Sequence, residues 1–198
     1  MRSSVPVASD GRVRCAWAGI ENDELYQRYH DTEWGRPVTG ERELFERLSL
    51  EAFQSGLSWI TILRKRDSFR SAFENFEPAA VAEFGPADVE RLLADASIVR
   101  NRMKINATIG NARALLALPA GTTLASLLAA HAPAVQRPAG DPVPAQTPES
   151  AQLAKTLKKL GFAFVGPTTS YAMMQAVGIV NDHQPECWLS GVEAQAAQ

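Results

Sequence analysis

Residues 41–54, ERELFERLSLEAFQ, decide the fold class of this chain. Their apolar residues recur with a period near that of an α-helix and lie largely on one face: Leu44, Phe45, Leu48 and Phe53. Glu51 falls among them, so a carboxylate lies within or beside the apolar face. A buried carboxylate is costly unless it is paired or functional, whereas a glutamate at the rim reaches water. On this segment alone both interpretations of Glu51 remain open.

The remainder of the chain also predicts helices. Gly56 interrupts the first one, and SWITILRKR at 58–66 resumes the helical pattern with a basic end. Pro78 and the Gly85-Pro86 pair are typical of helix entrances, since proline is tolerated in a first turn. We expect further helices at residues 86–95, 102–117, 122–131, 149–160 (with Gly161 as a C-cap) and about 168–178. With no alternating strand pattern and no repeat, we predict an all-α fold.

Residues 132–148 interrupt this helical pattern with five of the twelve prolines, which predicts an irregular connection. The part after it, about fifty residues, is small for a core of its own. We therefore predict one helical domain at 13–190, with a disordered tail at 1–12 and a second tail at 191–198.

The composition limits the classes of protein to which this chain can belong. A chain of 198 residues with net charge −2 suits one sizeable core. No apolar stretch approaches the roughly 20 residues of a membrane span, so we expect no membrane partner. Two cysteines and no export signal predict a reducing cytoplasm rather than a disulfide framework. The near-neutral total leaves nucleic acid open as a partner, because the local distribution of positive charge decides such binding.

Two cysteines and two histidines form small groups near opposite ends of the chain: Cys15, His30, His183 and Cys187. Such a set can hold one tetrahedral zinc ion, and four protein ligands leave no position for a reactive water. Zinc bound there would be structural and would tie the first segment to the last. Two buried free cysteines and two ordinary histidines are the alternative, and the spacing does not decide between them.

Residues 17–35, WAGIENDELYQRYHDTEWG, hold four aromatic side chains: Trp17, Tyr26, Tyr29 and Trp34. Aromatic residues this dense either form part of the core or line a slot for a planar ligand.

Residues 95–116, DASIVRNRMKINATIGNARALL, predict a short helix, a turn and a longer helix that carries Arg100, Arg102, Lys104 and Arg113. A helix–hairpin–helix of this kind can present cations and backbone N–H groups to phosphates. A solvated basic face is the alternative.

Together these segments resemble the 3-methyladenine DNA glycosylase I family across about residues 13–190. The resemblance rests on RCAWAG, YQRYHDTEWGRP, LFERLSLEAFQSGLSWITILRKR, DASIVRNRMKI and GFAFVGPTTSYAMMQAVGIVNDH. It implies a helix–hairpin–helix glycosylase fold in which Cys15, His30, His183 and Cys187 bind a structural zinc. It also implies a DNA-repair enzyme that hydrolyses the N-glycosidic bond of 3-methyladenine and so starts base excision repair.

The resemblance also implies residue roles. Glu51 matches the base-recognising and catalytic glutamate, and the pocket aromatics match Trp17, Tyr26, Tyr29 and Trp59. The Gly56-Leu57 turn matches the element that fills the duplex when the damaged base leaves. The phosphate-anchoring hairpin matches Arg100, Arg102 and Lys104. Met103 stands where the family often has glycine, and 132–148 diverges.

The family lacks the catalytic aspartate of most helix–hairpin–helix glycosylases, and residues 105–120 contain no acid. The resemblance therefore implies a monofunctional enzyme, without a lyase step. We expect a monomer that acts on double-stranded alkylated DNA in the cytoplasm, at the nucleoid. Three alternatives stay open: a glycosylase for bulkier alkyl-purine adducts, a catalytically silent damage-binding protein, and a zinc hydrolase unrelated to DNA.

Overall fold

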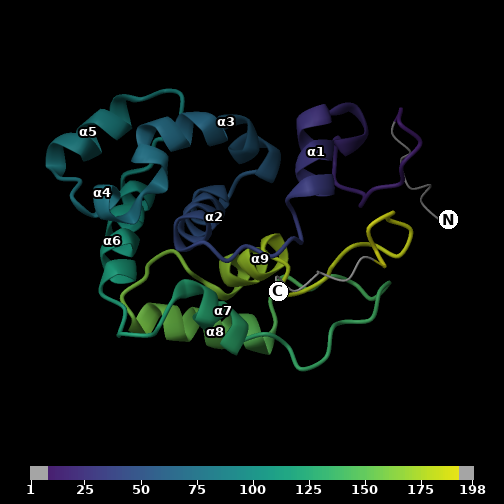
Figure 1. Ribbon diagram of the computed structural model, residues 1–198. Helices are drawn as coiled ribbons and strands as arrows, with labels where there is room; N and C mark the ends of the chain where they lie inside the picture. The colour runs from purple at the N-terminus through teal and green to yellow at the C-terminus, as the bar shows by residue number, and fades with distance from the viewer. Residues whose placement is uncertain (1–8, 192–198) are drawn as a thin grey trace.

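The computed structural model describes residues 9–191 and is built from helices (Figure 1). Within these residues there is no β-strand, which confirms the predicted all-α class. Residues 9–191 form two 3-10 helices and nine α-helices, in this order: η1 Ile20–Asn22, α1 Glu24–Thr32, α2 Glu41–Gln54, α3 Trp59–Ala72, η2 Glu74–Phe76, α4 Pro78–Ala82, α5 Pro86–Ala94, α6 Arg102–Leu116, α7 Leu124–Ala130, α8 Pro148–Lys159 and α9 Pro167–Ala176.

Local chemistry sets where these helices begin and end. Four of them begin on a proline, whose fixed φ suits a first turn and whose missing N–H is not needed there: α4, α5, α8 and α9. Asn101 caps α6 by accepting a hydrogen bond from the Lys104 N–H. Thr123 caps α7 by accepting from the Ser126 N–H, so this helix begins at Leu124 rather than at the predicted residue 122.

Helix α2 lies at the centre of the core and has the bounds predicted from its sequence. It packs against α3, α6, α7 and α9, while α4 packs on α6 and α8 packs on α9. Its four predicted core residues are at most 1 % exposed: Leu44, Phe45, Leu48 and Phe53. A second, smaller cluster of buried residues lies beside this core and contains Ile20, Tyr26, Tyr29 and Leu63. The cavity described below opens between the two clusters.

The segment after α9 returns to the N-terminal segment, and Figure 1 shows the purple and yellow ends of the described chain on the same side of the molecule. The Trp188 N–H donates to the Val13 carbonyl at 2.9 Å, and the Ala16 N–H donates to Gln184 Oε1 at 2.7 Å. These contacts join parts of the chain that are more than 160 residues apart.

Residues 1–8 and 192–198 contain most of the two predicted tails and lie outside the described residues. Within the predicted tail at 1–12, Asp10 accepts hydrogen bonds from Arg14, and Arg12 contacts Asp31. The predicted connection at 132–148 has no helix before α8 begins at Pro148, as expected. Among the residues described, no helix has the length and apolar character needed to cross a membrane.

Candidate functional site

A cavity of about 200 Å³ lies between α1, α2, α3 and α9. Its walls include all of the predicted substrate-binding residues and four that were not predicted to bind substrate. The lining residues are Trp17, Tyr26, Tyr29, Trp34, Glu51, Gln54, Trp59, Ala172 and Gln175. A cavity below the usual range of about 300–1,000 Å³ for drug-sized ligands suits a single small planar group.

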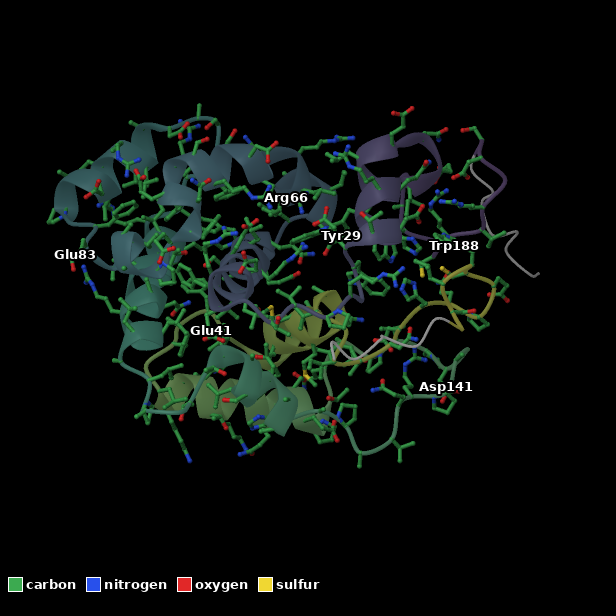
Figure 2. All side chains as sticks on the ribbon, in the orientation of Figure 1. Tyr29, Glu41, Arg66, Glu83, Asp141 and Trp188 are labelled. Atoms are coloured by element: carbon green, nitrogen blue, oxygen red, sulfur yellow. The ribbon has the colours of Figure 1, made fainter. Side chains whose placement is uncertain are left out.

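Aromatic side chains pack against one another around this cavity. The rings of Trp17 and Tyr26 lie 5.1 Å apart, and those of Tyr29 and Trp59 lie 5.2 Å apart. Trp34 meets Trp17 edge to face at 4.9 Å. Figure 2 shows Tyr29 in the space between α1 and α2. Because each ring is held by another ring, the wall presents fixed aromatic faces to whatever enters.

Glu51 places a carboxyl group in this aromatic wall. It is 6 % exposed, which rules out the rim interpretation, and no side chain of the described residues donates a hydrogen bond to it. Burial raises its pKa to about 8, and the positive charge of Arg47 opposes part of that rise. A carboxyl group with this pKa is mostly protonated at pH 7, and a positive charge placed beside it would lower its pKa.

A network of ion pairs lies next to Tyr29, on the side of the aromatic wall that faces away from the cavity. Glu33 accepts hydrogen bonds from Arg47 at 2.7 Å and from Arg66 at 3.0 Å. Burial alone would raise the pKa of Glu33, but the bonds from Arg66 and Arg47 hold it below its ordinary value. The Arg47 guanidinium also lies 5.5 Å from the centre of the Tyr29 ring. The network therefore fixes Tyr29 and places a positive charge one helical turn before Glu51.

The predicted wedge, Gly56-Leu57, forms an exposed turn between α2 and α3. Gly56 has φ +84°, a left-handed conformation that favours glycine, and Leu57 is 42 % exposed. Lys104 holds this turn from α6: its Nζ donates to the carbonyls of Phe53 at 2.8 Å and Ser55 at 2.6 Å. Lys104 is 7 % exposed, so its ammonium group lies inside the fold rather than on the surface of the hairpin.

The other two predicted phosphate-binding residues lie on the surface. Arg100 is exposed in the α5–α6 connection. Arg102 is exposed at the start of α6 and pairs with Glu90 of α5 at 2.8 Å. Met103 is 66 % exposed beside them. The α5–α6 connection and the start of α6 thus present two guanidinium groups and one apolar side chain to the solvent.

The four predicted metal ligands come together and are all buried. Their ligand atoms lie within 4.8 Å of one another. Three sulfur–nitrogen pairs are 3.5 Å apart: Cys15 with His183, Cys187 with His30 and Cys187 with His183. A tetrahedral zinc with Zn–S near 2.3 Å and Zn–N near 2.05 Å would separate such atoms by about 3.6 Å. The site therefore has the ligand set and the spacing that zinc requires.

Groups around this cluster orient its members. His30 Nδ1 lies 2.9 Å from Asp31 Oδ1, which leaves Nε2 turned toward the two sulfurs. The neighbouring Cys187 sulfur and burial raise the pKa of the Cys15 thiol, because a second thiolate here is unfavourable unless a cation lies beside it. Trp34 meets the His183 ring edge to face at 4.7 Å. The cluster thereby touches the aromatic wall of the cavity.

Comparison with known proteins identifies the group to which these features belong. A family model described as methyladenine glycosylase matches residues 17–190. The chain belongs to the methyladenine glycosylase family. It is 47 % identical over 179 residues to DNA-3-methyladenine glycosylase 1 of Escherichia coli K12, covering 88 % of this chain and 95 % of that protein.

Two solved structures support this assignment. A crystal structure of 3-methyladenine DNA glycosylase I superposes with TM-score 0.83 at 47 % identity, over 88 % of this chain and 98 % of the other. A variant of such a glycosylase in complex with 3-methyladenine superposes with TM-score 0.78 at 32 % identity, over 84 % and 92 %. The all-helical fold of this family member is therefore that of its relatives.

Four residues that line the cavity were not assigned to it from sequence: Trp34, Gln54, Ala172 and Gln175. Gln54 carried a usable signal, since it follows Glu51 by about one helical turn. Trp34 lay in the aromatic segment, but such a segment is also typical of a core. Ala172 and Gln175 had no such signal, because only the packing of α9 on α2 brings them to the cavity.

Proposed function

We propose that this protein removes 3-methyladenine from alkylated DNA by hydrolysing the bond between the base and its deoxyribose. The observation that carries the proposal is a buried carboxyl group, Glu51, set in an aromatic cavity of the size of one base. The relatives named above as 3-methyladenine glycosylases, one of them in complex with 3-methyladenine, support it.

The cavity suits a cationic purine. Stacking a base on an aromatic face contributes roughly 1–3 kcal/mol per base, and the negative face of the ring attracts a cation. Removing a damaged base from the helix costs less than removing an intact one. Trp17, Tyr26, Tyr29 and Trp59 would provide the stacking, and Glu51 would provide the negative partner once the cation lowers its pKa.

The bond cleaved joins C1′ to N9 of the methylated adenine. Its electron pair goes to N9, so the cationic base departs as neutral 3-methyladenine, and water adds to C1′ with loss of a proton. Glu51 lies where its carboxylate can stabilise positive charge that develops on the sugar or orient that water. No amine nucleophile is required, and no lysine is among the described residues that line the cavity, which agrees with a monofunctional enzyme.

The hairpin and the wedge are the proposed DNA-binding elements. Arg100 and Arg102 would bind phosphates, and Leu57 would enter the space left by the extruded nucleotide, as apolar wedges do in other proteins. Lys104 would act differently from the expectation based on resemblance, because it supports the wedge turn from within instead of reaching a phosphate.

We further propose that Cys15, His30, His183 and Cys187 hold one structural zinc in a monomeric protein. The 3.5 Å sulfur–nitrogen distances and the burial of all four ligands support this. When bound, zinc would provide a cross-link between the chain ends. The four residues would thereby keep Trp17 and Trp34, which touch His30 and His183, in register with the cavity.

Chromatography of the bases released from methylated DNA tests the proposed activity. The wild type should release 3-methyladenine, and Glu51→Gln should release it far more slowly. Release of bulkier alkyl-purines instead would favour the specialised glycosylase. Binding to methylated DNA without any released base would favour a silent damage-binding protein. Unchanged release by Glu51→Gln would remove Glu51 from the mechanism.

A further inference from the structure

Gln175 lines the cavity from α9, while Glu51 lines it from α2. Its side-chain amide does not turn freely, because Gln175 Nε2 donates to Asp182 Oδ2 at 2.8 Å. Asp182 is 4 % exposed and lies behind the cavity wall, in the segment that follows α9. The contact therefore ties a group in the wall to a buried carboxylate outside it.

The orientation of this amide is fixed by the other partners of Asp182. Arg137 Nε donates to Oδ1 at 3.0 Å, and the Tyr171 hydroxyl donates to Oδ2 at 2.6 Å. A carboxylate paired with arginine only accepts hydrogen bonds, so the NH₂ group of Gln175 must face it. The opposite orientation, with the amide oxygen against the carboxylate, is excluded because two acceptors would then face each other.

The amide oxygen is therefore the polar atom of Gln175 that remains available to a ligand in the cavity. Gln175 Oε1 accepts no hydrogen bond from the described residues and is not enclosed by protein, unlike the buried Nε1 of Trp59. A glutamine that lines a cavity, with its nitrogen held behind the wall, presents an acceptor that cannot become a donor. Such a group can select between ligands by the position of their donors.

We propose that Gln175 determines base specificity: its Oε1 accepts a hydrogen bond from the 6-amino group of a flipped 3-methyladenine. This inference rests on the proposed function. A purine with a 6-oxo group, such as 3-methylguanine, would place one acceptor against another and leave both unpaired. Gln175 thus favours adenine lesions over guanine lesions.

Glu51 alone discriminates less strongly between a 6-amino purine and a 6-oxo purine. Beside a neutral free base, its carboxyl group can keep a proton at neutral pH and so can donate or accept a hydrogen bond. It can therefore adapt to an amino group or to an oxo group. The amide of Gln175 cannot adapt, because turning it over would set its oxygen against the Asp182 carboxylate.

Binding of two free bases to the wild type and to Gln175→Leu tests the proposal. The bases are 3-methyladenine and 3-methylhypoxanthine, in which an oxygen replaces the 6-amino group, and tryptophan fluorescence reports the Kd. We expect the variant to bind 3-methyladenine about tenfold more weakly, the usual effect of one lost hydrogen bond, and 3-methylhypoxanthine almost unchanged. Gln152→Leu, on the exposed side of α8, is the matched control and should alter neither Kd.

Equal weakening for both bases would show that Gln175 only shapes the wall and would overturn the proposal, as would an unchanged Kd for 3-methyladenine. Gln175→Met, measured in parallel, gives the same test if the leucine variant does not fold. Base release from methylated DNA by the wild type separates the two claims. A wild type that releases no base but prefers 3-methyladenine through Gln175 would refute the enzymatic function and leave this inference standing.

Discussion

Glu51→Gln is expected to stabilise the empty protein while it impairs base excision. The wild-type carboxyl group is buried, with a pKa near 8 in place of its ordinary 4.5. Glutamine keeps the shape of the side chain and cannot ionise. The substitution therefore removes the free-energy cost of holding an acid away from water and leaves the packing of α2 intact.

The sign and size of the stability difference between the wild type and Glu51→Gln follow from proton linkage. Below pH 4.5 the carboxyl group is protonated in both the folded and unfolded states, so the two proteins should differ little. Between pH 4.5 and 8 the unfolded chain loses this proton while the folded protein keeps it, so wild-type stability falls by about 1.4 kcal/mol per pH unit relative to the variant. At pH 7 the variant should be about 3 kcal/mol more stable, and above pH 8 the difference should stop growing.

Urea unfolding of both proteins at pH 5, 6, 7 and 8, followed by circular dichroism, measures this difference. Glu83→Gln, an exposed glutamate at the end of α4, is the control and should show no comparable trend. A Glu51→Gln stability gain that is the same at all four pH values would refute the reasoning, because it would not come from ionisation.

Three further predictions concern the parts that hold the cavity in place. Lys104→Met should slow excision from duplex DNA about tenfold and leave free-base binding unchanged, since the turn bearing Leu57 loses two hydrogen bonds; equal effects on both would contradict this. Cys187→Ala should abolish zinc binding and lower the melting temperature on the order of 10 °C; wild-type melting would refute a structural metal. Gly178→Ala should lower the free energy of unfolding, measured in urea, by at least about 2 kcal/mol. Gly178 has φ +74°, and a Cβ there would lie 2.8 Å from the Gly35 carbonyl oxygen. A smaller loss would mean that the loop relaxes.

Much of the fold could be predicted because its signals are local. The apolar period of 41–54 gave the bounds of α2, and the prolines at 78 and 86 marked the starts of α4 and α5. The buried position of Glu51 was less certain, since periodicity places a residue on a face without saying what covers that face. Only the packing of the aromatic cluster against α2 settled its burial.

The lining residues that were predicted came from the resemblance of several segments to a known family, and residues to which that resemblance gave no role were missed. Tyr26 and Tyr29 stand together in the sequence, whereas Gln175 reaches the cavity through the packing of α9 and is oriented by Asp182, seven residues later. Lys104 illustrates a second limit. A lysine in a basic run resembles a surface cation, and only its contacts with Phe53 and Ser55 reveal its internal place.

The most direct test of the account is the identity of the base that wild-type protein releases from methylated duplex DNA, determined by chromatography beside Glu51→Gln at equal concentration. The account predicts 3-methyladenine as the main product of the wild type and a much smaller amount from the variant. Release of a different base, or equal release by both proteins, would contradict it.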